Sequence, residues 1–199
     1  MVMPGAVLRI QIFLSTQVDI LNLNLREFLK RKNTAMVDEK GQAISEQYFR
    51  DVRPFVNNVA AVRTKKGWGI MNSDGQFVLE PQYTEFEAQN AQCIVFRNER
   101  KCFFYSLEGT LYSTKKIPGK LFALGDDMFQ EKDDNQSRLF YSNGSSFKNG
   151  KKYRGEFLNQ NDTLILVKET RIKILDEEGK SKTKIKHYNG IRAVKLGKM

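Results

Sequence analysis

A glycine recurs at a nearly constant interval along the chain, and this period constrains the fold more than any other feature. Gly41, Gly75, Gly109, Gly144 and Gly179 are separated by 34, 34, 35 and 35 residues. A fixed period of this length is typical of repeat proteins, in which each period is one supersecondary unit that packs on its neighbours. The sequence therefore predicts about five structural units in series.

Each unit is predicted to contain a β-hairpin. A short apolar run precedes every one of these glycines, and a short polar side chain stands three residues before most of them. The polar residues at this position are Asp38, Asn72, Ser106 and Asp176, and the fourth unit has Tyr141 there. A polar residue that opens a type I turn, closed by a glycine with positive φ, forms a compact connection between two antiparallel strands.

A third strand is predicted in most units, about 18 to 20 residues after the glycine. The segments are rich in β-branched and aromatic residues, as is typical of half-buried strands. They are Val59–Val62, Cys93–Phe96, Met128–Phe129 and Leu164–Val167. A period of 34 residues holds three strands of about five or six residues with their turns, whereas four strands would be tight.

The predicted architecture is therefore mainly β: an array of about five degenerate antiparallel units, open and twisted rather than closed. The alternative is a closed five-bladed propeller, since five units are enough to form a ring. Hydrogen bonds between the first and last hairpins would distinguish the closed form from the open one.

The second unit carries a family resemblance. Residues 66–83 read KGWGIMNSDGQFVLEPQY. This segment resembles the bacterial WG repeat, in which Trp-Gly and an apolar pair precede a polar turn, a glycine, further apolar residues, a proline and a tyrosine. The residues that match are Trp68, Gly69, Gly75, Pro81 and Tyr83. The match is specific in this unit and degenerate in the others. The resemblance implies a β-rich, non-catalytic repeat array over roughly residues 33–199, whose members mostly lack an assigned biochemical role.

Trp68 is the only tryptophan. It stands beside Gly69, where the lack of a side chain lets an indole or a neighbouring strand pack closely. We therefore interpret Trp68, Gly69, Gly75, Pro81 and Tyr83 as structural residues. A tryptophan that stacks on a ligand is the alternative.

The first 32 residues do not follow the repeat, so we predict two regions: an N-terminal cap at 1–32, which is a strand and a helix or an eroded repeat, and the β-repeat domain at 33–199. Apolar residues at helical spacing predict a helix from about 17 to 31. They are Val18, Leu21, Leu25, Phe28 and Leu29. A helix there would cover the exposed first edge of the β array.

The chain is basic, with 33 lysines and arginines against 23 acidic residues and a net charge of +10. Near the end, Lys180, Lys182, Lys184 and Lys186 alternate with other residues. In a strand this spacing places all four lysines on one face. A charged edge strand that prevents sheet-to-sheet association is the favoured interpretation. The alternative is a stripe that binds a polyanion through its phosphates.

No catalytic constellation stands out. His187 is the only histidine, which excludes a His-rich metal site. The sequence has no phosphate-binding glycine loop, nucleophile elbow or cysteine-pair zinc spacing. We therefore expect no catalytic residue, no metal and no cofactor, and predict a non-enzymatic interaction or scaffold module that binds another protein. Binding of a nucleic acid or anionic surface is the alternative function.

Membrane insertion is not expected, because no segment approaches the roughly 20 apolar residues that span a bilayer. The N-terminus does not read as an ordinary signal peptide. Cys93 and Cys102 flank a turn-like segment and could face each other across a hairpin, but two buried free thiols are favoured in a reducing compartment. A cytoplasmic location is expected. The oligomeric state and the identity of the partner stay open.

Overall fold

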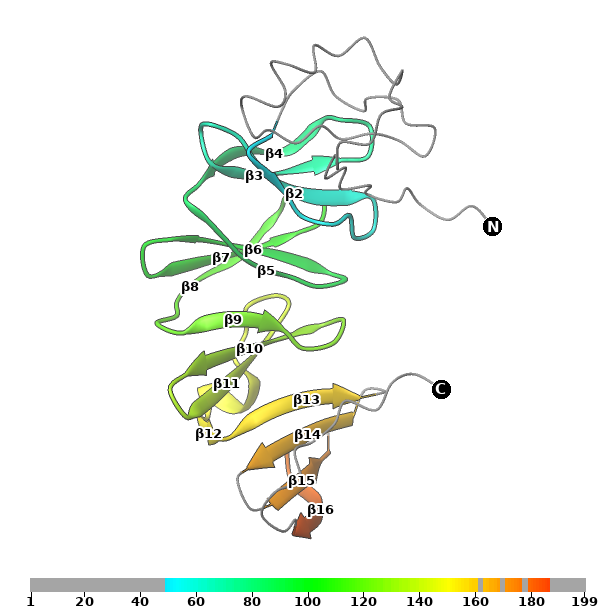
Figure 1. Ribbon diagram of the computed structural model, residues 1–199, viewed down its shortest axis with the longest axis vertical. Helices are drawn as coiled ribbons and strands as arrows, with labels where there is room; N and C mark the ends of the chain where they lie inside the picture. Colours follow the sequence, from blue (N-terminus) through cyan, green and yellow to red (C-terminus); the bar gives the residue numbers. More distant parts are fainter. Residues whose placement is uncertain (1–48, 161–162, 169–170, 177–178, 187–199) are drawn as a thin grey trace, which may run out of the picture. The chain divides into compact units, whose positions relative to one another are not determined.

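Four consecutive four-stranded antiparallel sheets make up the described part of the chain (Figure 1). The computed structural model describes residues 49–160, 163–168, 171–176 and 179–186. In every sheet the spatial order of the strands is their order in the chain, so each strand pairs with the next one. The mainly β fold predicted from the sequence is confirmed.

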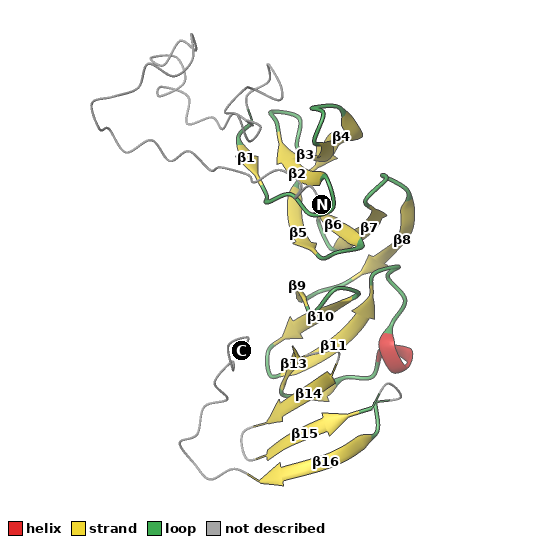
Figure 2. Cartoon of the chain, turned by 90° about the vertical axis from the view of Figure 1, so that its right-hand side faces the viewer, coloured by secondary structure: helices red, strands yellow, loops and turns green. Residues whose placement is uncertain are grey.

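The first sheet consists of β1 (Asp51–Val52), β2 (Val59–Arg63), β3 (Trp68–Asn72) and β4 (Phe77–Tyr83). The second consists of β5 (Glu85–Gln89), β6 (Cys93–Asn98), β7 (Lys101–Ser106) and β8 (Leu111–Lys116). The third consists of β9 (Lys120–Ala123), β10 (Met128–Asp133), β11 (Gln136–Tyr141) and β12 (Tyr153–Arg154), with the 3-10 helix η1 (Phe147–Gly150) before β12. The fourth consists of β13 (Glu156–Gln160), β14 (Thr163–Lys168), β15 (Arg171–Leu175) and β16 (Ser181–Lys186) (Figure 2).

The prediction of three strands per unit was wrong, because a fourth strand opens each sheet. The predicted third strands correspond to β2, β6, β10 and β14, and the predicted hairpins begin with β3, β7, β11 and β15. The unpredicted strands are β1, β5, β9 and β13. Four strands fit into one period because the connections are short: only Glu99 and Arg100 separate β6 from β7. In the third sheet, η1 and the two-residue β12 replace the expected partner of the hairpin.

The predicted turn chemistry is present at the glycines. Gly75 has φ +80°, and its N–H donates to the carbonyl of Asn72 at 3.1 Å. Asn72 Oδ1 accepts the backbone N–H of Gln76 at 2.8 Å. Asp176 has the same role in the fourth sheet, where its carbonyl accepts the N–H of Gly179 at 2.8 Å. The polar residue and the glycine therefore form one turn, as their spacing predicted.

Strand pairing does not close the array into a ring. Among the described residues, no strand of the first sheet pairs with a strand of the last. The predicted open arrangement is thereby confirmed. The predicted helix at 17–31, the boundary between residues 32 and 33, and the first unit around Gly41 lie outside the described residues. In the part of the chain that the structure describes, no helix has the length and apolar character needed to cross a membrane.

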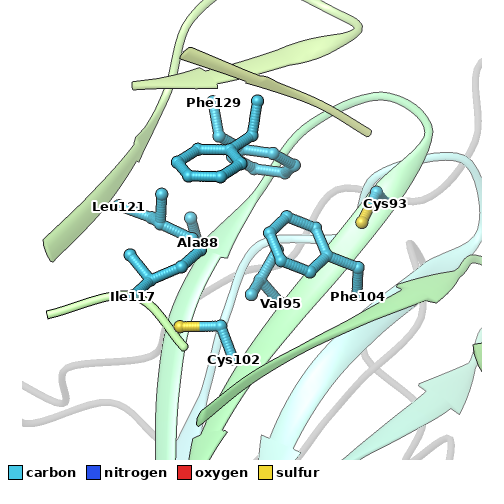
Figure 3. Close-up of a cluster of buried hydrophobic side chains, with 9 residues drawn as sticks. Ala88, Cys93, Val95, Cys102, Phe104, Ile117, Leu121 and Phe129 are labelled. Carbon is cyan, nitrogen blue, oxygen red and sulfur yellow. The ribbon is translucent and has the colours of Figure 1, made fainter. Parts of the chain in front are cut away.

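The chain divides into two compact units. Unit 1 comprises the residues up to Phe86 together with Phe96–Asn98 and Leu107–Thr110, and unit 2 comprises the rest. The core of unit 1 contains Phe49, Ala60, Val62 and Met71. Unit 2 has two buried clusters. The first, drawn in Figure 3, contains Ala88, Cys93, Val95, Cys102, Phe104, Ile117, Leu121, Phe129 and Phe140. The second contains Leu124, Met128, Leu139, Phe147, Phe157, Leu164, Leu166 and Leu175.

The turn glycines of three repeats, Gly109, Gly144 and Gly179, lie directly against the preceding repeat. A Cβ atom at Gly144 would lie 1.9 Å from Ser113 Oγ, and one at Gly179 would lie 3.0 Å from Phe147 Cζ. In unit 1, a Cβ atom at Gly109 would lie 2.7 Å from the carbonyl oxygen of Val78. Val78 precedes Gly109 by 31 residues, Ser113 precedes Gly144 by 31 residues, and Phe147 precedes Gly179 by 32 residues. The glycine period therefore has two causes: positive φ in the turn and close packing between sheets.

Buried polar contacts also join sheets within unit 2. Asn90 Nδ2 donates to Ser142 Oγ at 2.9 Å, while Asn90 Oδ1 accepts the N–H of Cys93 at 2.9 Å. Glu87 Oε1 accepts the backbone N–H of Leu121 at 2.7 Å. Because a buried polar group without a partner is costly, these contacts fix how successive sheets meet inside this unit.

Candidate functional site

The Trp-Gly pair lies at the start of β3. A Cβ atom at Gly69 would lie 2.4 Å from the carbonyl oxygen of Leu79 and 2.8 Å from the nitrogen of Pro81. Trp68 pairs with Tyr83 and Ile70 pairs with Leu79, so three residues of β4 stand opposite Gly69 alone. Glycine is required here because β4 approaches the backbone of β3. Pro81 is compatible with this irregularity, since β4 is an edge strand that has no further partner in the described sheet.

Trp68 is buried, and only 4% of its surface is exposed. Its ring lies 5.5 Å from that of Phe86, centroid to centroid. The guanidinium carbon of Arg53 lies 5.2 Å from the Trp68 centroid and 5.0 Å from the Phe86 centroid. Arg53 Nη2 also donates to Asp51 Oδ2 at 3.2 Å. A cation that belongs to the chain therefore occupies the position where a ligand cation would meet these rings.

Tyr83, the last residue of the matching segment, is also buried. Its ring stacks on Phe96 with 5.1 Å between the centroids and an interplanar angle of 2°. Sequence reasoning missed Arg53, Phe86 and Phe96 as partners of the motif. No local pattern could have found them, because Arg53 follows β1, Phe86 and Phe96 lie on β5 and β6, and the contacts depend on how these segments pack.

The predicted lysine stripe is a strand, but its alternation is interrupted. Lys180 precedes β16, and a bulge between Thr183 and Ser181 leaves Lys182 without a direct partner in the register. Lys184 stands opposite Lys173, and Lys186 stands opposite Arg171. The register thus brings basic residues of two neighbouring strands together. β16 is the last strand of its sheet, as the edge-strand interpretation predicted.

A second basic group lies at one end of β7 and β8, and the sequence analysis did not identify it. Arg100, Lys101, Lys115 and Lys116 are all exposed. Within the described part of the chain, the side chains of these four residues form no ion pair. Lys101 stands directly opposite Lys116. The sequence shows the four basic residues, but a bulge at Tyr112 shifts the register by one residue, so the turn at Gly109 alone does not place Lys101 opposite Lys116.

A buried ion pair joins β10 to β11. Glu131 is 1% exposed, and Arg138 stands opposite it in the register. Arg138 Nη2 donates to Glu131 Oε1 at 2.9 Å, and Arg138 Nε donates to Glu131 Oε2. The backbone N–H of Gly119 donates to the same carboxylate at 3.0 Å. The hydrogen bonds that Arg138 donates to Glu131 raise the pKa of Arg138 above its usual value. This carboxylate holds the chain before β9 in place and is fully occupied by partners.

Cys93 and Cys102 are free and buried, and Figure 3 shows their sulfur atoms separated, with Val95 and Phe104 between them. Burial raises the pKa of the Cys93 thiol to about 12. The thiol therefore stays protonated near neutral pH, where a nucleophile or metal ligand has to be a thiolate. Among the described residues there is no group of three or more histidine, cysteine or acidic side chains placed to hold a metal ion.

The fold and the Trp-Gly segment define a class of β-repeat protein built from four-stranded units. The family model for the WG containing repeat matches residues 68–88. This segment is therefore similar to the WG containing repeat, which confirms the resemblance seen in the sequence. No curated protein matches the chain.

Solved structures show the same kind of fold. Hsv2 of Kluyveromyces lactis, with loop 6CD replaced by a Gly-Ser linker, is 15% identical with a TM-score of 0.53, over 85% of this chain and 64% of that one. Kluyveromyces lactis Hsv2 is 14% identical with a TM-score of 0.51, over 74% of this chain and 56% of that one. The chain spans less than two thirds of either protein. These structures are β-propeller-like, and at this identity the similarity concerns the fold alone.

Proposed function

We infer that this protein is a non-enzymatic interaction module that binds another protein. The observation that carries this proposal is the repeated contact between turn glycines and preceding sheets, seen at Gly144 and at Gly179 within unit 2. Contacts of this kind hold successive sheets in a fixed arrangement, and stacked repeats offer the extended surfaces that repeat proteins use for binding. The WG repeat at residues 68–88 supports the same proposal.

A binding role is also supported by the side chains of Trp68, Glu131 and Cys93, whose functional groups are occupied by other residues or kept protonated. The Trp68 ring is occupied by Arg53, the Glu131 carboxylate by Arg138, and the Cys93 thiol is held in its protonated form by burial. Each of these groups stabilises the fold. The two free thiols also favour a reducing compartment, so we propose a cytoplasmic location.

Binding of a polyanion is the second candidate, and the register of β15 and β16 favours it. Lys184 stands opposite Lys173 and Lys186 stands opposite Arg171, so the register places basic residues of the two strands at facing positions. Such binding would depend little on sequence and would weaken steeply with salt. Fluorescence anisotropy with DNA, RNA and heparin at two salt concentrations tests it. Equal binding by the wild type and by a variant with Lys180, Lys182, Lys184 and Lys186 changed to glutamine would exclude this strand.

Affinity purification of the full chain from its source organism, followed by mass spectrometry, tests the main proposal. We expect a protein partner that rebinds the purified chain with a fixed stoichiometry in calorimetry. Recovery of no stable partner, together with turnover of a metabolite by the pure chain, would overturn it.

A further inference from the structure

We propose that the open edge of β8 binds an extended, acidic peptide segment of a partner protein as an additional antiparallel strand. The proposal rests on the proposed function, because it names the surface and the kind of partner. It is carried by three observations: the exposure of β8, the direction of its backbone groups, and the exposed basic side chains beside it.

β8 is an edge strand along its whole length. It is the last strand of the second sheet, and β7 is its only strand partner among the described residues. Five of its six residues are exposed, and the sixth, Ser113, is partly buried. Leu111 and Tyr112 are each 47% exposed, the highest values among the large apolar residues in the described chain. An extended peptide can reach an edge of this kind and add to the sheet.

The hydrogen-bond pattern shows which backbone groups are available. The N–H of Ile117 donates to the carbonyl of Arg100 at 3.1 Å, and the register continues from that pair through Lys101 opposite Lys116 to Phe103 opposite Thr114. Hydrogen-bonded and non-hydrogen-bonded pairs alternate in antiparallel sheets. Thr114 and Lys116 therefore belong to non-hydrogen-bonded pairs, and their N–H and C=O groups point away from β7 toward the open edge.

The charge beside this edge defines the chemistry of the occupant. Lys101 and Lys116 form a non-hydrogen-bonded pair, the type in which opposing side chains lie closer. Like charges directly opposite each other are destabilising. Arg100 and Lys115 add two more positive charges at the same end of the two strands. Strand alternation places Lys101 and Lys116 on one face of the sheet and Arg100 and Lys115 on the other. Glutamate or aspartate side chains of an added strand that lie on the first face would neutralise Lys101 and Lys116 while the backbone forms the ladder.

The last strands of the other described sheets are protected against strand addition. β4 contains Pro81, which has no N–H, and has irregular register opposite Gly69. β12 has two residues, and β16 carries lysines along its whole length with a bulge at Lys182. Short strands, prolines, bulges and lysines are all devices that discourage edge pairing. β8 shares two of these devices, because it has a bulge at Tyr112 and lysines at positions 115 and 116, but its run from Ser113 to Lys116 keeps a regular register.

The test uses the full chain and a fluorescein-labelled peptide, Ser-Val-Glu-Val-Glu-Val-Glu-Val-Glu-Ser, followed by anisotropy. A twin peptide with lysine in place of each glutamate is the matched probe. Thr114→Pro removes one outward N–H without removing a bond to β7, and Thr114→Ala is its control because it keeps the N–H. K101E/K116E reverses the central charges, and K65E/K66E makes the same change at an exposed turn in unit 1.

We expect the glutamate peptide to bind the wild type and the lysine peptide to bind much more weakly. Thr114→Pro and K101E/K116E should each weaken binding by about fivefold or more, because the first removes a backbone hydrogen bond and the second reverses two charges. Thr114→Ala and K65E/K66E should stay within about twofold of the wild type. Hydrogen exchange at the Thr114 and Lys116 amides should slow on binding. Far-UV circular dichroism confirms that each variant is folded, because Trp68 emission reports on unit 1 and the variants of β7 and β8 lie in unit 2.

Three results would overturn the proposal. In the first, the glutamate peptide does not bind the wild type. In the second, Thr114→Pro and Thr114→Ala bind it equally well. In the third, heparin binds more tightly than the peptide at the same lysines. The last would assign this group to a polyanion. The proposed function fails separately: a natural partner that still binds Thr114→Pro and K101E/K116E would keep the interaction role while excluding the β8 edge.

Discussion

The guanidinium group of Arg53 lies over the ring of Trp68, with 5.2 Å between the guanidinium carbon and the ring centroid. The same carbon lies 5.0 Å from the centroid of Phe86, so one arginine contacts two aromatic rings. Trp68 is the residue on which the family resemblance rests, and its ring is used to hold Arg53 inside unit 1. Several properties of the protein can be tested from this and related contacts.

Arg53→Met should lower the free energy of unfolding by about 1 kcal/mol, because the methionine keeps much of the apolar contact and loses the attraction between the cation and the two rings. Urea unfolding followed by the emission of Trp68 measures the change. Arg63→Met is the control, since Arg63 is an exposed arginine of β2. An equal loss in both variants would contradict a specific role for the ring contact.

Trp68→Ala should cost about 3 to 5 kcal/mol of stability, as is usual when a large aromatic side chain is removed from a core. Far-UV circular dichroism during urea unfolding measures it. The wild-type emission should be blue-shifted and resistant to iodide, because the ring is 4% exposed. Emission like that of tryptophan in water would show that the packing interpretation is wrong.

Gly144→Ala should destabilise the protein more than Gly150→Ala. The two glycines have φ of +78° and +77°, so the backbone strain of an alanine is matched. A Cβ atom at Gly144 would lie 1.9 Å from Ser113 Oγ, whereas the nearest atom to one at Gly150 is 3.9 Å away. We expect a difference of about 1 to 3 kcal/mol, the usual cost of overpacking, in chemical unfolding at pH 7. Equal losses would indicate that only the turn conformation needs glycine.

Arg138→Met should cost about 3 to 5 kcal/mol, because it leaves the buried Glu131 carboxylate without its main partner. R138M/E131L should recover most of this loss, since an apolar pair of similar size often replaces a buried ion pair at little cost. Urea unfolding of the single and double variants at pH 7 gives both values. A double variant no more stable than Arg138→Met would argue that packing, and not the unpaired charge, causes the loss.

The raised pKa of the Cys93 thiol leads us to expect that the free energy of unfolding falls at alkaline pH. Its pKa is raised from 9.0 to about 12 in the folded protein, so between these values the unfolded state releases the proton while the native state keeps it. The native state then binds more protons, and stability falls as the pH rises. From pH 8 to 10 the wild type should lose about 1.4 kcal/mol more than Cys93→Ala. The same pH dependence in both proteins would contradict this assignment.

The turns were predictable from sequence because their chemistry is local. Asn72 and Gly75 lie three residues apart, and the side chain, the carbonyl and the positive φ all act within that turn. The apolar strands β2, β6 and β14 were predictable for a similar reason, since their composition alone indicates buried β structure.

The first strand of each sheet was not predictable in this way. β5 reads EFEAQ and β9 reads KLFA, with few of the residues that favour strands. Such strands form because their backbones complete a sheet that the neighbouring strands have begun, which is a tertiary effect. The site residues differ in the same way. Trp68 and Gly69 were identified from their neighbours in the sequence. The contact of Arg53 with Trp68 depends on the packing of distant segments, and the bulge at Lys182 depends on one extra residue in β16.

The contacts of Gly109, Gly144 and Gly179 with Val78, Ser113 and Phe147 have a consequence for how such a chain can change in length. Each contact joins positions about one period apart, so an in-frame loss or gain of one whole period leaves the remaining glycines beside equivalent partners wherever the cut falls. A truncation between two sheets separates a glycine from its partner instead. Recombination that adds or removes a whole period therefore preserves the position of each glycine contact, so the number of units can vary more readily than their spacing.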